Sequence, residues 1–398
     1  MIFGLNTRIK KLRRENMIYF DNSATTKVAP AVLATYNAVS EKIWGNPSSL
    51  HALGEQSYEL LEQARAQIAQ LIGCQAHEIF FTSGGTEGDN WVIKGTALEK
   101  MKYGKHLIAS SIEHPAVSHA LQQLAKQGFD VTYLPVDKEG RVNPSDLKQA
   151  LRKDTILVTV MAVNNEVGSI QPLAEIAEIL KEYPKIHFHV DAVQALGKGL
   201  QTLLNNERID FLTFSGHKFH APRGVGFIYK KRGKKLQPLL AGGGQEKNLR
   251  SGTENLPAIA AMAKALRLLL DDEQAKVKQQ ATIKEYLANK LSTYPNVVMH
   301  SQTSATFAPH ILCFSILGVR GETIVHAFEK EGIYISTTSA CSSKKGISSS
   351  TLSAMHVADD IATSAVRVSL DEENTLKEAE EFLAVFAKLY QRFEQLNS

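Results

Sequence analysis

Apolar residues along this chain follow two alternating patterns: short continuous runs, and longer stretches in which they recur at helical spacing. The short runs predict buried strands near 78–82, 106–109, 131–134, 156–163, 187–190, 211–214 and 225–229. Between them the spacing predicts helices, as from Ser57 to Ile72, where Gly73 is a typical stop signal. This alternation favours an α/β fold with a largely parallel sheet covered by helices on both faces.

The pattern changes after the glycines at 242–244. From Pro257 to about Leu291 it predicts a long, charged helical stretch, which is the best candidate for a hinge between two domains. The remaining residues read as two or three strands, a Ser-rich loop at 337–353 and a final helix from Leu376. They predict a smaller α+β domain.

We therefore expect three parts: a basic extension at 1–16 outside the fold, a large domain at 17–256, and a small α+β domain at 257–398. The first residues of the large domain are candidates to pack with the small one. The extension also has two other interpretations, as a targeting segment or as a nucleic-acid-binding arm. We favour an extension with Met17 as the natural start.

Composition narrows the class of protein. Hydrophobic residues make up 43% and charged residues 22%, which excludes a collagen-like, coiled-coil or mainly disordered chain. The basic residues before Met17 account for the whole formal net charge of +4, so the rest of the chain is neutral. A neutral body gives no electrostatic reason to expect direct nucleic-acid binding. No apolar run reaches the ~20 residues of a membrane span, so we expect no membrane partner.

The cysteines also restrict the function. Cys74, Cys313 and Cys341 show no CxxC spacing and are too few for a disulfide framework. They predict neither a structural zinc site nor another metal centre, and they favour a reducing, cytoplasmic compartment.

Three strand ends carry candidate binding chemistry. The turn 83–86 lies between a strand and a helix, where glycines let backbone N–H groups approach a phosphate. Asp191 ends an apolar strand, and Lys218 follows Ser215 and His217 after another. Each candidate has a competing interpretation. The residues at 83–86 could form an ordinary turn, Asp191 could be a helix N-cap, and Lys218 could be a surface lysine.

The fourth candidate is Cys341, which has small, polar neighbours in a loop-like segment. Cys74 and Cys313 instead look like small buried hydrophobic residues. An exposed thiol on a flexible loop is a candidate nucleophile. A carboxylate, a lysine and a phosphate-binding turn together suit pyridoxal 5′-phosphate, which needs a protonated ring nitrogen and a Schiff-base lysine.

With these motifs the chain resembles the cysteine desulfurases of the NifS/IscS type, within the fold-type I pyridoxal-phosphate enzymes of aminotransferase class V. The resemblance runs from about Met17 to the C-terminal helix, and its motifs occur in order. They are Asp-Asn-Ser-Ala-Thr-Thr at 21–26, Gly-Asn-Pro-Ser-Ser at 45–49, Thr-Ser-Gly-Gly-Thr-Glu-Gly-Asp-Asn at 82–90, Glu-His-Pro-Ala-Val at 113–117, Val-Asn-Asn-Glu-Val-Gly at 163–168, His-Val-Asp-Ala-Val-Gln at 189–194, Ser-Gly-His-Lys at 215–218, Arg-Ser-Gly-Thr at 250–253 and Ser-Ala-Cys at 339–341. The resemblance implies a large cofactor-binding domain with a mainly parallel sheet of the seven-stranded type, and a smaller α+β domain.

The resemblance also implies roles around the cofactor ring. Lys218 is the Schiff-base lysine and Asp191 pairs with the pyridine nitrogen. Gln194 contacts the ring hydroxyl. His114 stacks on the ring and moves protons, although a structural loop histidine is the alternative interpretation.

For the cofactor phosphate, the resemblance implies contacts from Gly85, Thr86, Ser215 and His217. Thr253 reaches it from the other subunit of a homodimer.

For the substrate, the resemblance implies that Asn165 and Arg367 bind the carboxylate of L-cysteine, and a planar guanidinium suits such a contact. A surface ion pair is the alternative for Arg367. The Cys341 thiolate attacks the substrate sulfur, which leaves L-alanine and a persulfide on the enzyme.

Two departures from the family pattern concern sulfur delivery. Thr338 stands where the family usually has glycine, and Asp371 replaces another glycine. These departures leave open which protein accepts the sulfur. The candidates are an iron–sulfur scaffold, a tRNA-thiolation enzyme and a thiamine-pathway carrier. The competing functions are another enzyme on the same scaffold (an aminotransferase, a kynureninase-like hydrolase or a selenocysteine lyase) and a non-catalytic binding protein.

Overall fold

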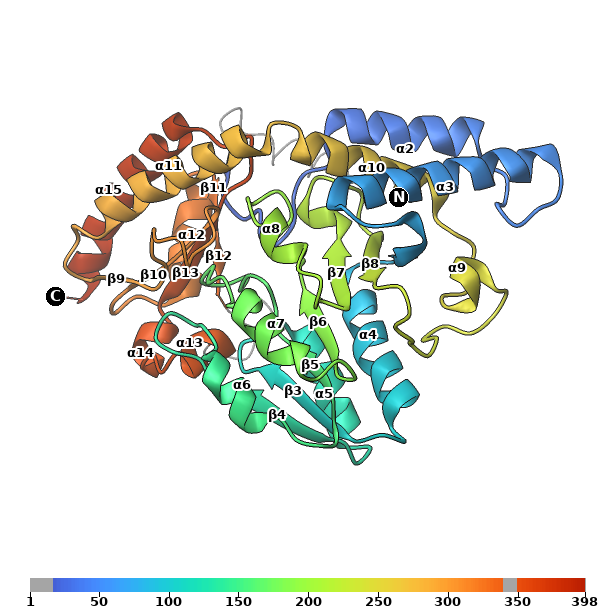
Figure 1. Ribbon diagram of the computed structural model, residues 1–398. Coiled ribbons are helices and arrows are strands. Elements are labelled where there is room, and N and C mark those ends of the chain that lie inside the picture. The colour runs from blue at the N-terminus through green and yellow to red at the C-terminus, as the bar shows by residue number, and fades with distance from the viewer. Residues whose placement is uncertain (1–16, 339–348, 398) are drawn as a thin grey trace. The chain divides into compact units, whose positions relative to one another are not determined.

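The computed structural model describes residues 17–338 and 349–397, and the chain divides into two compact units (Figure 1). The large unit comprises residues 25–165 and 169–275, and the small unit comprises residues 17–24, 166–168 and the described residues from 276 onward. The predicted extension at 1–16 lies outside the described residues.

The large unit is built on a seven-stranded sheet with the order β2-β8-β7-β6-β5-β3-β4. Its strands are β2 (Ile79–Thr82), β3 (His106–Ser110), β4 (Asp130–Leu134), β5 (Thr155–Thr159), β6 (His187–Asp191), β7 (Phe211–Ser215) and β8 (Gly226–Lys230). Neighbouring strands from β7 to β4 run parallel, while β8 is antiparallel to both β7 and β2. The predicted α/β fold with a mainly parallel sheet is therefore confirmed.

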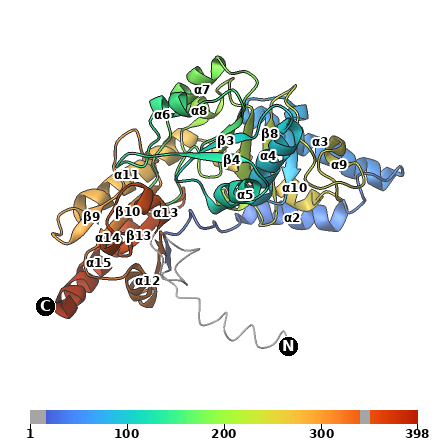
Figure 2. The same cartoon turned by 90° about the horizontal axis from the view of Figure 1, so that it is seen from below.

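Helices cover both faces of this sheet. The helices of the large unit are α2 (Pro30–Lys42), α3 (Ala52–Ile72), α4 (Gly85–Lys100), α5 (Pro115–Ala125), α6 (Pro144–Ala150), α7 (Leu173–Lys181), α8 (Gln201–Leu204), α9 (Gln245–Asn248) and α10 (Leu256–Leu270), with 3-10 turns η2 (Ala76–Glu78) and η3 (Gly216–Lys218). Figure 2 shows α4 and α5 on one side of β3 and β4, and α6, α7 and α8 on the other. Apolar residues of α4 and α5 form one core cluster with those of β3 and β5.

Local signals in the sequence explain several element ends. Gly73 takes the left-handed conformation (φ 78°, ψ 36°) that ends α3, which confirms the predicted stop. Proline occupies the first turn of α2, α5 and α6, where its missing N–H costs no intrahelical bond. Asn143 caps α6 by accepting a hydrogen bond from the N–H of Ser145 at 3.0 Å.

The predicted long helix from 257 to 291 is two helices in the structure, α10 and α11 (Glu273–Leu291). They are separated at Asp271, whose backbone is extended, and Asp272, which has a positive φ of 52°. Helix α10 packs on α2 and α3, so it belongs to the large unit, and the boundary between the units falls inside α11. The structure thus divides the chain at 275–276, whereas the sequence pattern placed the division at 256–257.

The small unit contains a four-stranded antiparallel sheet with the order β12-β13-β10-β9, and a parallel pair β1-β11. Its elements are β1 (Ile18–Tyr19), α11, β9 (Val297–Met299), β10 (Ile311–Ile316), α12 (Gly321–Lys330), β11 (Ile333–Tyr334), β12 (Ser336–Thr337), α13 (Ser350–Ala354), α14 (Asp359–Ala362), β13 (Ala365–Ser369) and α15 (Leu376–Asn397). One apolar cluster, which includes Phe20, Phe314, Phe328, Phe382 and Phe386, forms its core.

The predicted Ser-rich loop at 337–353 needs a correction at its end. Residues from Ser350 form α13, because the Ser349 hydroxyl caps the helix by accepting a hydrogen bond from the N–H of Leu352 at 3.1 Å. Residues 339–348 of that stretch lie outside the described part of the chain. None of the helices in the described ranges is long and apolar enough to cross a membrane.

A buried lysine on α11 makes the stability of the small unit depend on pH. Lys284 is 3% exposed, and its Nζ donates a hydrogen bond to the carbonyl oxygen of Ala308 at 2.8 Å. Burial lowers the pKa of Lys284 to about 7. In the unfolded chain this lysine binds its proton up to a much higher pH, so the native state loses stability as pH falls from about 10 toward 7.

We predict that Lys284→Met raises the free energy of unfolding below pH 7 by up to about 5 kcal/mol, and that the gain disappears near pH 10. Denaturant titrations at pH 6, 8 and 10 measure this difference. Lys278→Met, on an exposed position of the same helix, is the control and should change little at any pH. A gain from Lys284→Met that does not vary with pH would contradict the prediction.

Candidate active site

The polar residues that the sequence singles out follow strands that lie side by side in the large sheet. Strands β3, β5, β6 and β7 are parallel neighbours, so their carboxyl ends share one edge of the sheet. His114 follows β3, Asn165 follows β5, Asp191 ends β6, and Ser215 ends β7 just before Lys218. Ligands of open α/β sheets bind at this edge, so the topology alone gathers the candidates.

Asp191 is the buried carboxylate of this edge, with 5% of its surface exposed. Its Oδ1 accepts a hydrogen bond from the N–H of Val193 at 3.0 Å. Burial raises the pKa of Asp191, while the charges of His114 and Lys218 and the Val193 bond oppose that rise. The three predicted residues Asp191, His114 and Lys218 therefore act on one another electrostatically.

Two further buried carboxyl groups, Asp89 and Glu113, lie near Asp191, and the sequence reasoning missed both. Burial raises the pKa of Glu113 to about 8, with repulsion from Asp191 adding to the rise. The pKa of Asp89 is also raised well above its ordinary value, first by burial and then by Asp191. Glu113 accepts hydrogen bonds from the Ser110 hydroxyl and from the N–H of Met161.

The environments of these three acids differ in one respect. His114 and Lys218 favour the charged form of Asp191, whereas only hydrogen bonds favour the charged forms of Glu113 and Asp89. Negative charge at this edge of the sheet is therefore best stabilised on Asp191. In its charged form, the Asp191 carboxylate is suited to pair with a protonated ring nitrogen.

His114 is the N-cap of α5, and its Nδ1 accepts a hydrogen bond from the N–H of Ala116 at 3.1 Å. Burial and the nearby charge of Lys218 lower its pKa, although Asp191 acts in the opposite direction. A neutral ring that accepts at Nδ1 carries its proton on Nε2. His114 is therefore held as a neutral ring that can stack and can donate from Nε2.

The Gly-rich turn before α4 lies directly against the end of β7. A Cβ atom on Gly85 would approach the Val193 side chain to 2.9 Å and the Ser215 side chain to 3.4 Å, so only glycine fits without a shift. The first N–H groups of α4 have no intrahelical partner, and Thr86 is exposed beside them. Together with the Ser215 hydroxyl they form a set of donors suited to a phosphate.

Lys218 and His217 lie on the 3-10 turn η3 that follows β7, and both are half-buried. His217 Nδ1 lies 3.1 Å from the Thr25 hydroxyl, and burial, with the charge of Lys218, lowers its pKa to about 4. A neutral His217 keeps one ring nitrogen as a donor. Gln194 is buried in the turn after β6.

The remaining predicted residues of the large unit lie on loops. Asn165 is half-buried in the turn between Val163 and Ile170, which form an isolated bridge. Thr253 is exposed, three residues after Arg250. Arg250 donates two hydrogen bonds to Glu87 of α4, at 2.7 and 3.0 Å, so the segment before Thr253 is tied to the Gly-rich turn.

Arg367 lies on β13 of the small unit, 4% exposed. Its Nη2 donates to Asp21 Oδ1 at 2.8 Å, in an ion pair whose arginine is buried and whose aspartate is 20% exposed. Glu166 also acts on Arg367 electrostatically and accepts a hydrogen bond from the Ser349 hydroxyl. Both acids lie in motifs that the sequence analysis quoted without giving them a role. Cys341 lies outside the described residues.

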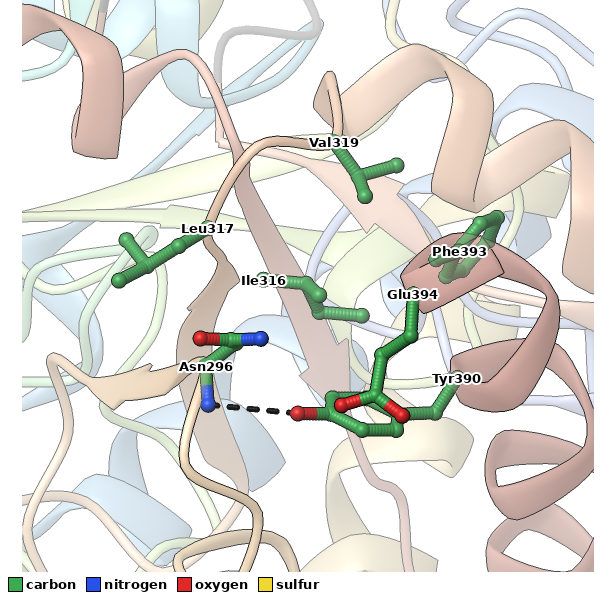
Figure 3. Close-up of a pocket in the computed structure, with 7 residues that line it drawn as sticks. All are labelled: Asn296, Ile316, Leu317, Val319, Tyr390, Phe393 and Glu394. Atoms are coloured by element: carbon green, nitrogen blue, oxygen red, sulfur yellow. Dashed lines mark hydrogen bonds between the residues drawn. The ribbon is translucent and has the colours of Figure 1, made fainter. Parts of the chain in front are cut away.

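A pocket of about 240 Å³ lies elsewhere, in the small unit (Figure 3). Its lining residues are Asn296, Ile316, Leu317, Val319, Tyr390, Phe393 and Glu394. The Tyr390 hydroxyl in it accepts a hydrogen bond from the N–H of Asn296 at 3.3 Å. None of the predicted site residues within the described ranges lines this pocket.

Comparison with known proteins identifies the family of this chain. The model of the family "Aminotransferase class-V" matches residues 18–382. The chain belongs to this family, among its NifS/IscS members.

The relatives fit that assignment over nearly their whole length. A protein of Lactobacillus delbrueckii subsp. bulgaricus, named NifS/IcsS protein homolog, is 60% identical over 96% of this chain and 99% of its own. The cysteine desulfurase IscS of Dictyoglomus turgidum is 39% identical over 97% of both chains. Among solved structures, a NifS-like protein superposes with a TM-score of 0.87 at 36% identity, covering 96% of this chain and 99% of the other.

The cofactor of this family is pyridoxal 5′-phosphate, and the strand-end site fits it. The buried Asp191 suits a protonated pyridine nitrogen, and Lys218 supplies an amine on the neighbouring strand end. Glycine at position 85 lets the α4 N-terminus lie against Val193 and Ser215, where a Cβ atom would crowd both side chains, and the first N–H groups of α4 and the Ser215 hydroxyl suit a phosphate.

Proposed function

We propose that this chain removes the sulfur of L-cysteine, releases L-alanine and carries the sulfur as a persulfide on Cys341. The observation that carries the proposal is the buried Asp191 beside Lys218 and His114, next to the Gly85 turn. A binding protein would need neither the buried carboxylate nor the lysine. The relative from Dictyoglomus turgidum, named a cysteine desulfurase, supports the same reaction.

The large unit would hold the cofactor through residues of several elements. Asp191 would pair with its ring nitrogen, Gln194 would contact its ring hydroxyl, and His114 would stack on the ring. Gly85, Thr86, Ser215 and His217 would bind the phosphate, and Thr253 would do so from the second subunit of a homodimer. When bound, the cofactor withdraws electrons from the substrate α-carbon, which acidifies the α-proton and activates the Cβ–S bond.

Protein groups would perform the proton transfers. Lys218, half-buried beside Asp191, would hold the cofactor and then move the substrate α-proton as a free amine. His114 would donate from Nε2, since its Nδ1 is engaged by Ala116. Asn165 and Arg367 would bind the substrate carboxylate.

The sulfur step would be a displacement at the substrate sulfur. The thiolate of Cys341 forms the new S–S bond as the Cβ–S bond of L-cysteine breaks. The electron pair of that bond remains with the substrate carbon, which then takes up a proton and becomes the methyl group of alanine. Sulfur leaves the substrate as the outer atom of the persulfide, so no external oxidant is needed.

We further propose a cytoplasmic homodimer that passes the persulfide sulfur to an acceptor protein of the iron–sulfur scaffold, tRNA-thiolation or thiamine-pathway type. Large apolar side chains exposed between α2 and α3 supply a surface for the second copy, with Trp44 70% and Leu50 fully exposed. No direct contact with nucleic acid is required, since the acceptor protein carries the sulfur onward.

We predict that Cys341→Ala lowers sulfide release from L-cysteine in the presence of a thiol reductant by at least about 10³-fold, because the mutant has no nucleophile for the sulfur. Alanine and sulfide are measured together and should be equimolar for the wild type. Cys74→Ala is the matched control and should keep full activity, because burial raises the pKa of the Cys74 thiol to about 12.

The same assay separates the competing enzymes. Pyruvate as the product, or alanine formation that survives Cys341→Ala, would indicate a lyase or hydrolase on the same scaffold, and 3-mercaptopyruvate would indicate an aminotransferase. Each of these results would overturn the proposal. A selenocysteine lyase would instead release alanine from selenocysteine far faster than from L-cysteine.

A further inference from the structure

Three consecutive residues with side chains adopt the left-handed conformation just before the 250–253 motif. Glu246 has φ 48° and ψ 46°, Lys247 has φ 58° and ψ 41°, and Asn248 has φ 64°. Non-glycine residues visit this region as single residues, because Cβ crowds the following carbonyl oxygen. A run of three is strained, and it persists only where the surrounding structure holds it.

The group that holds this turn is Glu246, which is 6% exposed. Its two carboxylate oxygens accept hydrogen bonds from Arg65 Nη1 at 2.8 Å and Nη2 at 2.6 Å. Oε2 also accepts from the N–H of Phe81 on β2 at 2.9 Å. The carboxylate is thus anchored to both α3 and the sheet.

Arg65 is itself immobilised. Nη1 donates to the carbonyl oxygen of Ile79 at 2.8 Å, Nε donates to Glu62 at 2.9 Å, and the guanidinium lies 4.6 Å from the centre of the Phe81 ring. Because these contacts hold the guanidinium in place, Arg65 presents its two terminal nitrogens to Glu246 in a fixed orientation. The buried ion pair therefore supplies a rigid attachment point for the strained turn.

Two side-chain contacts connect the turn 246–248 to the segment that carries Thr253. The Gln245 side-chain oxygen accepts a hydrogen bond from the N–H of Gly252 at 2.9 Å, so the start of the turn holds the residue before Thr253. Arg250, between them, is paired with Glu87 at 2.7 Å. The path of the segment from 245 to 253 is therefore set at one end by Arg65 and at the other by Glu87.

We propose that Arg65 and Glu246 are positioning residues for cofactor binding: their buried ion pair locks the left-handed turn 246–248 and so presents Thr253 to the cofactor phosphate. This inference rests on the phosphate-binding role proposed for Thr253. Neither residue touches the cofactor in this scheme, and both act through the backbone of the segment that follows them.

The test measures cofactor affinity directly, by equilibrium dialysis of the full-length apoenzyme against pyridoxal 5′-phosphate. Glu246→Gln keeps the shape of the side chain but removes the charge, and we expect the Kd to rise at least about tenfold. Arg65→Lys keeps the positive charge but cannot donate two parallel hydrogen bonds to Glu246, and we expect the same rise in Kd. Arg152→Gln removes the exposed ion pair with Asp130 and should leave the Kd unchanged.

Three comparisons distinguish positioning from a general loss of stability. Pyridoxal, which lacks the phosphate, should bind wild type and Glu246→Gln equally well. In a Thr253→Ala background, Glu246→Gln should add nothing to the loss. Adding Lys247→Gly to Glu246→Gln should restore part of the affinity, because glycine adopts the left-handed conformation without strain and does not need the ion pair to hold it there.

The proposal is overturned if Glu246→Gln leaves the Kd for pyridoxal 5′-phosphate unchanged, weakens pyridoxal equally, or adds fully to Thr253→Ala. It is also overturned if Thr253→Ala itself has no effect on the affinity. Alanine release by the wild type tests the desulfurase reaction separately, so an inactive wild type with the expected affinities would count against the reaction and not against this positioning role.

Discussion

Lys218→Ala should lower the rate of alanine formation from L-cysteine by about 10⁴-fold or more, because the variant loses both the amine that holds the cofactor and the group that moves the α-proton. Its position supports both functions, since it follows the buried strand β7 and acts electrostatically on Asp191. The purified variant should also lose the visible absorbance of covalently held cofactor. Activity and absorbance are measured on the same preparation.

Two variants sharpen this result. Lys218→Arg keeps the positive charge next to Asp191 but cannot form the covalent bond, so it should be as inactive as Lys218→Ala. Lys230→Ala, which removes a half-buried lysine on β8 of the same sheet, should remain active and coloured. A small primary amine added to Lys218→Ala should restore part of the proton transfer. Full activity of Lys218→Ala would rule out the proposed chemistry.

Asp191→Asn should lower kcat on the order of 10³-fold, since an amide cannot keep the ring nitrogen protonated and the electron-withdrawing power of the ring falls. Steady-state rates with saturating L-cysteine measure the effect. Affinity for the cofactor should fall less, because the phosphate-binding groups around Gly85 and Ser215 are unchanged.

A neighbouring buried acid provides the matched control. Glu113 has a pKa raised to about 8 by burial, so it carries a proton at neutral pH and Glu113→Gln replaces one neutral group with another. This variant should keep its rate within a few-fold. A cofactor analogue with a permanently methylated, positively charged ring nitrogen should recover part of the rate of Asp191→Asn. Equal losses in both variants would mean that the charge of Asp191 is not what matters.

Strands and helices of the large unit follow local rules that the sequence carries. The apolar run at 187–190 appears as β6 (His187–Asp191), and Gly73 ends α3 as predicted. Short apolar runs between turn residues favour a buried strand, and glycine adopts the left-handed conformation at lower cost than other residues. These elements could be predicted without a structure.

Other features depend on packing that no local pattern encodes. Helical spacing continues across Asp271 and Asp272, yet the helix breaks there and α10 packs on α2 and α3. Likewise, Asp89 and Glu113 are ordinary acidic residues in the sequence. Their pKa values rise only because tertiary folding buries them near Asp191.

For the active site, the sequence by itself determined the residue types and their order: a glycine-rich turn, an aspartate and a lysine, each following a strand. Tertiary structure decided what surrounds them. The parallel arrangement of β7, β6, β5 and β3 puts the strand ends on one edge, and burial with His114 and Lys218 sets the charge of Asp191. The contact between Glu246 and Arg65 joins residues far apart in the chain, and no local pattern specifies which distant partner a buried charge will meet.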